Sequence, residues 1–217
     1  HVQAPTPAIH HLMSDKTRQN IVVMASGNAG KLREFARLLA PLDMQVQSQS
    51  VFDVPEVPED GLSFVENAII KARAASKFTK LPALADDSGL EVDYLNGAPG
   101  IYSARYAGPQ NAPGADANNN EKLLEALRDV PEAKRTARFQ CVLVYMRHWE
   151  DPTPLICQGS WEGVILSAPR GENGFGYDPL FYLPEYGCSS AELDAGQKNR
   201  SSHRAHASIK LLEALRS

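Results

Sequence analysis

Two apolar patterns follow each other near the start of the chain. Residues 21–25 (Ile-Val-Val-Met-Ala) form an unbroken apolar run rich in β-branched side chains, which is typical of a buried strand. Between residues 31 and 39, leucine, phenylalanine and alanine recur at helical spacing until Pro41 ends the pattern. A glycine-containing turn separates the two patterns. The sequence therefore predicts a strand, a loop and a helix in direct succession.

Weaker signals continue the pattern as far as residue 77. Residues 46–51 have the composition of a second strand and lead into an acidic, proline-rich loop at 53–61. A helix is predicted over residues 63–77, because alanine, phenylalanine and isoleucine form an apolar face there. At its start, Ser63 and Glu66 have the spacing of a capping box.

The second half of the chain is dominated by strands. Residues 118–127 predict a helix, and residues 138–147 and 155–164 are rich in valine, phenylalanine, leucine and isoleucine on either side of a turn at Asp151-Pro152. We expect these two segments to pair as long strands. A final helix is predicted over residues 201–215. The alternation of helices and strands indicates an α/β fold with a mixed sheet.

Length and composition agree with one ordinary globular domain. The chain has 217 residues, of which 43% are hydrophobic and 22% are charged. We assign residues 20–217 to a single domain of one or two lobes. Residues 1–19, which open with an aperiodic segment containing His10-His11, are assigned to a flexible N-terminal arm or a remnant of an expression tag. No run approaches the about 18 apolar residues of a membrane helix, so no membrane partner is expected.

The charge balance and the cysteines narrow the classes of partner. The formal net charge of −4 argues against a nucleic-acid partner, although a small anionic ligand in one basic pocket remains open. The three cysteines are odd in number and lack C-x-x-C spacing, which disfavours a disulfide framework or a zinc site. A reducing cytoplasm fits best.

The loop between the first strand and helix is the first candidate for chemistry. It reads Ser26-Gly27-Asn28-Ala29-Gly30-Lys31, so it offers backbone N–H groups, a helix N-terminus and one lysine to phosphate oxygens. A P-loop is excluded, because only two residues separate the first glycine from the Gly-Lys pair and Leu32 follows the lysine. A plain turn with a solvated lysine is the alternative.

Carboxylates mark a candidate site for a hard cation. A short strand is predicted at residues 83–85, and Asp86-Asp87-Ser88-Gly89 follows at its carboxyl end, where α/β sheets tend to bind ligands. If the strand persists, the two aspartates point to opposite sides and one of them faces the cation. Glu56 and Glu59 of the acidic loop are further candidate ligands. An Asx turn and a solvated loop are the alternatives.

Two later segments could bind a flat ring and its polar edge. The segment 171–179 contains three glycines around Phe175 and Tyr177, which could stack on a base, and Asp178, which could accept hydrogen bonds from it. The start of the final helix supplies donors suited to a phosphate or a carbonyl oxygen. These donors are Lys198, His203 and Arg204. A core-packed turn and a surface charge cluster are the alternatives.

In this order the motifs resemble the inosine/xanthosine triphosphate pyrophosphatase family. The resemblance runs from Ile21 to Leu215 and rests on six strings of the sequence. They are Ser-Gly-Asn-Ala-Gly-Lys at 26–31, Ser-Phe-Val-Glu-Asn-Ala at 63–68 with Lys71, Ala-Asp-Asp-Ser-Gly-Leu at 85–90, Gly-Ala-Pro-Gly-Ile-Tyr-Ser-Ala-Arg-Tyr at 97–106, Gly-Phe-Gly-Tyr-Asp-Pro at 174–179 and Ser-His-Arg at 202–204.

The resemblance implies an elongated, two-lobed α/β fold with a central mixed sheet flanked by helices, which forms a homodimer. It implies Mg²⁺-dependent hydrolysis of the deaminated purine nucleotides ITP, dITP and XTP to the monophosphate and pyrophosphate. By the same resemblance, residues 26–31 hold the triphosphate, Asp87 is the catalytic carboxylate and a metal ligand, and Glu56 is a second metal ligand with which Glu59 competes. The residues expected to line the nucleotide site are Ser88, Phe175, Gly176, Tyr177, Asp178, Lys198, His203 and Arg204.

Three other readings remain open at this point. A nucleotide-binding regulator would use the same pocket without hydrolysis. An enzyme of similar architecture could act on modified pyrimidine nucleotides. A nucleic-acid-binding module would need a basic patch, for which the candidates are Lys122, Lys134, Arg135 and Arg138.

Overall fold

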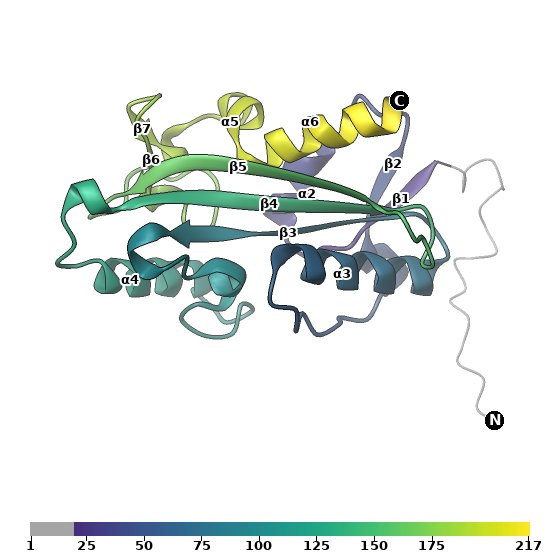
Figure 1. Ribbon diagram of the computed structural model, residues 1–217, viewed down its shortest axis with the longest axis horizontal. Coiled ribbons are helices and arrows are strands. Elements are labelled where there is room, and N and C mark those ends of the chain that lie inside the picture. The colour runs from purple at the N-terminus through teal and green to yellow at the C-terminus, as the bar shows by residue number, and fades with distance from the viewer. Residues whose placement is uncertain (1–19) are drawn as a thin grey trace.

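A seven-stranded mixed sheet forms the centre of the molecule. The computed structural model describes residues 20–217, so the arm predicted for residues 1–19 lies outside the described residues. The strand order is β2-β1-β3-β4-β5-β6-β7 (Figure 1). β1 runs parallel to β2 and β3, and every later pairing is antiparallel. The strands are β1 (Ile21–Met24), β2 (Gln45–Ser48), β3 (Ala83–Val92), β4 (Thr136–Met146), β5 (Leu155–Ile165), β6 (Phe181–Leu183) and β7 (Cys188–Ser189).

The helices cover the sheet in layers. They are α2 (Ala29–Leu38), α3 (Phe64–Thr79), α4 (Ala115–Ala126), α5 (Ala195–Ser201) and α6 (His203–Arg216). Figure 1 shows α3 and α4 below the long strands and α5 and α6 above them, and α2 packs with α6 on the same face of the sheet. None of these helices is long and apolar enough to cross a membrane, as far as the chain is described.

Three apolar clusters divide the molecule into two lobes. In the lobe that holds β1, Val142 and Val144 of β4 pack with α3, whereas Cys141 and Leu143 pack with α2 and α6 on the other face. This alternation follows from the period of two in a strand. In the other lobe, the far ends of β3, β4 and β5 join α4, β6 and the turn around Tyr177 in one cluster. The elongated, two-lobed α/β fold is thus confirmed.

Most predicted elements are present, with shifted ends. α2 begins at Ala29, two residues early, and β2 gives way to a 3₁₀ turn after Ser48. The helix predicted over 201–215 is α6, which begins two residues later at His203; Ser202 caps it through its side chain and ends the preceding helix α5, which was not predicted. At α3, Ser63 accepts the Glu66 N–H as predicted, but the Glu66 carboxylate accepts the Ser63 hydroxyl (2.6 Å).

The strand that carries the two aspartates is much longer than predicted. β3 does not end at Ala85 but continues to Val92, and it pairs with β4 over its whole length, from Ala83↔Met146 to Val92↔Ala137. The expectation that Asp86 and Asp87 follow the end of a strand is therefore wrong. Both lie inside the strand, where successive side chains point to opposite faces.

Candidate functional site

Two side chains of the loop between β1 and α2 bind its backbone N–H groups and fix its conformation. The Asn28 side-chain oxygen accepts the N–H of Lys31 (3.0 Å), and Ser26 Oγ accepts the N–H of Asn28 (3.1 Å). These contacts are an N-cap and a local turn, which point the positive end of α2 towards the loop. Ala29 and Gly30 already belong to the first turn of α2.

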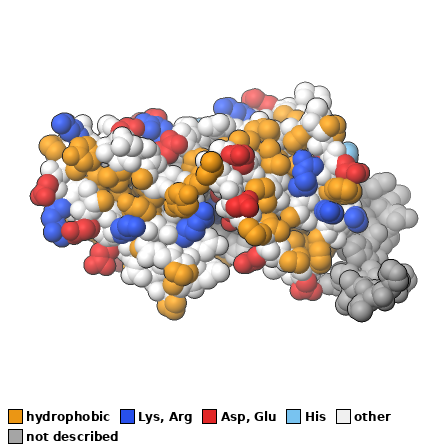
Figure 2. Space-filling model, turned by 60° about the horizontal axis from the view of Figure 1, so that its bottom comes forward, with side chains coloured by type: hydrophobic (Ala, Val, Ile, Leu, Met, Phe, Trp, Pro, Cys, Tyr) orange, Lys and Arg blue, Asp and Glu red, His pale blue; other side chains and the backbone are white. Residues whose placement is uncertain are grey.

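An outer pocket of about 330 Å³ opens beside this loop. Its lining includes Ser26, Gly27, Asn28, Lys31, Gln49, residues 54–57, Glu59, Lys71, Asp87, Ser88, Ile101, Ala104, Arg105, Gln110, Asn111 and Asp116. These residues come from both lobes. Figure 2 shows a hollow across the middle of the corresponding face, with acidic side chains along its right side and basic ones along its left. Four residues of the loop, Ser26, Gly27, Asn28 and Lys31, thus lie in one pocket with Asp87 and Glu56, whereas Ala29 and Gly30 do not line it.

Asp87 is a buried carboxylate with a free oxygen. Its Oδ1 lies 3.6 Å from the Lys71 ammonium, and its Oδ2 has no hydrogen-bond partner among the described residues. Burial raises the pKa of Asp87 to about 6, although the charges of Lys71 and Lys31 oppose the shift. A carboxylate whose pKa lies close to neutral pH is suited to accept a proton from water.

The chemistry of the outer pocket suits a hard cation that also binds phosphate. Glu56 and Glu59 line it with Asp87, and Glu59 lies 3.0 Å from the Lys71 ammonium. No group of three or more metal-binding side chains occurs within residues 20–217. Mg²⁺ usually binds one or two protein carboxylates and completes its shell with water and phosphate oxygens. The free Asp87 oxygen and one acid of the loop fit that requirement.

Asp86 points to the opposite face of β3 and is fully engaged. Its Oδ1 lies 2.7 Å from the Lys31 ammonium, and its Oδ2 accepts the Cys141 thiol (3.2 Å). Burial alone would raise the pKa of Asp86, but the charges of Lys31 and Arg204 hold it at about 2. Lys31 therefore reaches the pocket with its position fixed by a buried counter-ion.

A smaller inner pocket of about 100 Å³ adjoins the outer one. It is lined by Asn28, Lys31, residues 88–90, Ser103, Ala104, Asp116, Asn119, Phe139, residues 175–178, His203 and Arg204. Gly174 and Gly176 have φ of +75° and +61°, which favours glycine and lets the turn bring Phe175 and Tyr177 together. The Tyr177 hydroxyl donates to the Ser103 carbonyl (2.7 Å) and fixes that wall.

Two residues that line the inner pocket have buried polar atoms without a hydrogen-bond partner in the described part of the chain. His203 Nδ1 and Arg204 Nε are buried, and neither has a hydrogen-bond partner among the described residues. Burial and the neighbouring cations hold the pKa of His203 well below its usual range, so the ring is neutral. The ring stacks on Phe139 at 4.8 Å. Buried polar groups are rarely left unpaired, so these atoms point to a polar ligand.

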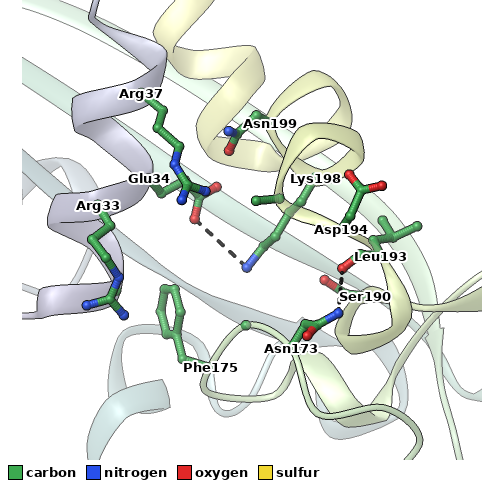
Figure 3. A pocket seen from close by; sticks show the side chains of 13 residues that line it. Arg33, Glu34, Arg37, Asn173, Phe175, Ser190, Leu193, Asp194, Lys198 and Asn199 are labelled. Atoms are coloured by element: carbon green, nitrogen blue, oxygen red, sulfur yellow. Dashed lines mark hydrogen bonds and ion pairs between the residues drawn. The ribbon is translucent and has the colours of Figure 1, made fainter.

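Lys198, which was expected in the nucleotide site, lies beside the inner pocket but does not line it. It lines a separate side pocket of about 390 Å³ between α2 and α5, where Figure 3 shows it reaching from α5 towards Glu34. Its ammonium lies 2.7 Å from Asp178 Oδ2 and 3.9 Å from Glu34 Oε2. Lys198 therefore acts on the inner pocket through Asp178. Gly30 lines the side pocket too, and a Cβ there would lie 2.7 Å from the Phe175 ring.

Sequence reasoning gave no role to several residues of the site. Glu34 on α2 accepts from Ser202 (3.0 Å) and lies 3.4 Å from Arg204, so it holds the start of α6. Lys71 of α3 donates to the Asp86 carbonyl (2.6 Å) beside Asp87. Glu34 could have been found from its i, i+3 spacing to Lys31, which places both on one face of a helix.

Two residues of the rival basic patch, Arg135 and Arg138, are engaged within the fold, whereas Lys122 and Lys134 are exposed. Arg135 is buried and donates to the carbonyls of Leu127 and Val130, and Arg138 lies 2.9 Å from both Asp93 and Glu162. These guanidinium groups have carbonyl or carboxylate partners already. They do not offer the exposed positive surface that nucleic-acid binding needs.

Comparison with known proteins gives one consistent family. A sequence model of the Ham1 family matches residues 22–214. The dITP/XTP pyrophosphatase of Vibrio cholerae is 59% identical over 194 residues, which cover 89% of this chain and 96% of that protein. The corresponding protein of Salmonella typhi is 58% identical over 195 residues, or 90% and 98% of the two chains.

Solved structures agree with the sequence relatives. A HAM1 protein from Coxiella burnetii has a TM-score of 0.82 at 50% identity and covers 90% of this chain and 98% of its own. The Staphylococcus aureus Ham1 protein has a TM-score of 0.76 at 42% identity, with coverages of 90% and 97%.

Proposed function

Since the chain belongs to the Ham1 family and is a nucleoside-triphosphate pyrophosphatase, we propose that it hydrolyses ITP, dITP and XTP to the monophosphate and pyrophosphate. The proposal includes a requirement for Mg²⁺ and action as a homodimer in the cytoplasm. Its role is to remove deaminated purine nucleotides before they enter DNA and RNA.

One observation carries the proposal. The buried Asp87 carboxylate, whose Oδ2 has no hydrogen-bond partner within residues 20–217, lies in the same pocket as Ser26, Gly27, Asn28 and Lys31 of the loop. A separate pocket of suitable chemistry for a polar ring adjoins it, so a nucleotide can span the two. The outer pocket suits the triphosphate and the inner pocket suits the base.

Different residues of the outer pocket are assigned to metal binding, to activation of water and to stabilisation of the leaving group. Asp87 and one of Glu56 and Glu59 would hold Mg²⁺, which when bound neutralises phosphate charge and polarises the α-phosphate. Asp87 orients a water molecule for attack on the α-phosphorus and accepts its proton. Lys31 and the N–H groups at the start of α2 stabilise the charge that develops on the leaving pyrophosphate.

Lys71 keeps this region balanced in charge. Burial would lower its pKa, but the carboxylates of Asp87 and Glu59 raise it, so the ammonium stays charged. It lies against Asp87 Oδ1 and leaves Oδ2 for the water or the cation. We assign Lys71 to the positioning of Asp87.

We propose that the inner pocket distinguishes 6-oxo purines from adenine through donors that have no partner among the described residues. Arg204 Nε, and His203 in the tautomer with its proton on Nδ1, would donate to the 6-oxo group of hypoxanthine or xanthine. Adenine carries an amino group there and would leave both buried donors without an acceptor. Such a mismatch discriminates by about 10⁴-fold or more.

A panel of nucleotides tests the proposal directly. The protein is incubated with ITP, dITP, XTP and the standard nucleoside triphosphates, with Mg²⁺ or with EDTA, and pyrophosphate and orthophosphate are measured separately. We expect pyrophosphate only with Mg²⁺, and mainly from the deaminated purines. Binding of ITP without hydrolysis would instead indicate a nucleotide-binding regulator. Preferred cleavage of modified pyrimidine nucleotides would indicate an enzyme of similar architecture that acts on pyrimidines.

A further inference from the structure

The inner and outer pockets meet along a short boundary. The residues that line both are Asn28, Lys31, Ser88, Ala104 and Asp116. In a nucleoside triphosphate, the sugar lies between the base and the phosphates. If the proposed function holds, with the base in the inner pocket and the phosphates in the outer one, the sugar must lie against this boundary.

Four of the boundary residues are already committed or apolar. The Lys31 ammonium lies 2.7 Å from a buried carboxylate of β3, and Ser88 Oγ accepts from an arginine of α6 (2.9 Å). The Asn28 side-chain oxygen caps α2 (3.0 Å). Ala104 has no polar side-chain atom. Sugar hydroxyls are donors that need an acceptor, and Asp116 is the carboxylate at this boundary.

The side chain of Asp116 is fixed at the boundary by α4. Its Oδ2 accepts the N–H of Gly176 (3.0 Å), and one turn later Asn120 donates to the Gly176 carbonyl (3.0 Å). The two side chains therefore bind both backbone groups of Gly176, which lies in the turn that lines the inner pocket. A carboxylate has about four acceptor positions, so Asp116 can bind Gly176 and a hydroxyl group at once.

We propose that Asp116 accepts a hydrogen bond from the 3′-hydroxyl of the substrate sugar. The proposed substrates include XTP, which has both sugar hydroxyls, and dITP, which lacks the 2′-hydroxyl. The 3′-hydroxyl is the donor that they share. A contact to this group recognises the sugar without rejecting deoxynucleotides.

The test compares three inosine nucleotides on Asp116→Ala. The probes are ITP, dITP and 2′,3′-dideoxyinosine triphosphate, and kcat/KM is measured for each. A hydrogen bond to a charged acceptor predicts that the wild type prefers dITP to the dideoxy compound by about 10- to 100-fold. Loss of the hydrogen bond to Gly176 should lower kcat/KM of Asp116→Ala equally for all three nucleotides. Beyond this common loss, kcat/KM should fall by about the same 10- to 100-fold factor for ITP and dITP and should not fall for the dideoxy compound, so the preference disappears.

Two further variants separate contact from positioning. Asn120→Ala removes the other hold on Gly176 but keeps the carboxylate, so it should lower kcat/KM by one common factor on all three nucleotides. Asp116→Asn keeps an acceptor and should restore part of the preference for the 3′-hydroxyl. An equal loss on all three nucleotides in Asp116→Ala would overturn the sugar contact while the proposed function stands. Absence of pyrophosphate from wild type with every nucleotide overturns the proposed function itself.

Discussion

The two faces of β3 treat neighbouring aspartates in opposite ways. On the face towards α2 and α6, Asp86 lies 2.7 Å from Lys31, accepts the Cys141 thiol and has its pKa held at about 2. On the α3 face, Asp87 keeps a buried oxygen without a partner among the described residues, and burial raises its pKa to about 6. The same residue type is a fully paired ion on one face and a carboxylate with an unpaired oxygen, among the described residues, on the other.

The difference shows that burial alone does not decide the role of a carboxylate. Both side chains are buried, and desolvation raises the pKa of each. Asp86 gains more from its direct ion pair than it loses by desolvation, whereas the nearest ammonium to Asp87 is 3.6 Å away and is shared with Glu59. Unfilled hydrogen-bonding capacity is what singles out the Asp87 face as the proposed substrate side.

Removing the charge of Asp87 should have the largest effect. Asp87→Asn is expected to lower kcat for ITP by about 10³- to 10⁴-fold, because it removes the proposed proton acceptor and a metal ligand. The far-ultraviolet circular dichroism should not change, because the carboxylate has no partner on Oδ2 to lose. Pyrophosphate release with saturating Mg²⁺ is the measurement, and near-normal turnover would end the assignment.

Removing the neighbouring charge should instead weaken the fold. Asp86→Ala leaves the Lys31 ammonium without its buried counter-ion and removes the acceptor of Cys141. We expect the free energy of unfolding to fall by about 3 kcal/mol, as for other broken buried pairs. Urea denaturation measures it. A free energy of unfolding for Asp86→Ala equal to or above that of Asp87→Asn would contradict the division of roles between the two faces.

The pH dependence of stability should differ in sign between the two aspartates. A carboxyl whose folded pKa is raised to about 6 destabilises the fold at neutral pH, and this cost disappears as the pH falls through 6 towards 4. In EDTA, Asp87→Asn should therefore be more stable than wild type by about 2–3 kcal/mol at pH 7.5, and by roughly nothing at pH 4.

The opposite dependence is expected for Asp86. Its folded pKa of about 2 stabilises the fold above pH 4, and that contribution is lost as the pH falls from about 4 towards 2. Denaturation in urea at a series of pH values tests both aspartates together. Parallel pH profiles for wild type and Asp87→Asn would contradict the raised pKa.

The smallest predicted effect is a change in the Mg²⁺ requirement, which should show whether Glu56 or Glu59 is the second metal ligand. Glu56→Gln is expected to raise the Mg²⁺ concentration for half-maximal activity by about 10-fold, the lower end of what altered metal-site partners cost. Glu59→Gln, which removes the other partner of Lys71, should change the requirement less. Titration of activity with Mg²⁺ decides between them, and the reverse order would assign the second ligand to Glu59.

Local patterns predicted the parts of the site that depend on short segments. The apolar run at 21–25, the glycine turn and the helical spacing after it gave β1, the loop and α2, because each of these signals arises within a few residues. The prediction that only one of Asp86 and Asp87 would face a cation followed from the period of two. It is consistent with the opposite surroundings of the two side chains.

Long-range contacts set what the patterns missed. The apolar run at 83–85 indicated a short strand, but pairing with β4 extends β3 to Val92 through polar residues and glycine. Lys198 was grouped with the inner pocket from its motif, yet packing of α5 against α2 places it behind Asp178. Neither contact leaves a signal in the sequence near these residues.

Residue types, the order of the motifs and most of the local elements that carry them follow from the sequence. The fold sets which carboxylate is paired and which keeps an unpaired oxygen, because Lys31 from α2 and Lys71 from α3 approach opposite faces of one strand. It also decided that Asp116 lies at the boundary of the two pockets. The physical reason is that burial and ion pairing depend on distances between elements, which local spacing does not encode.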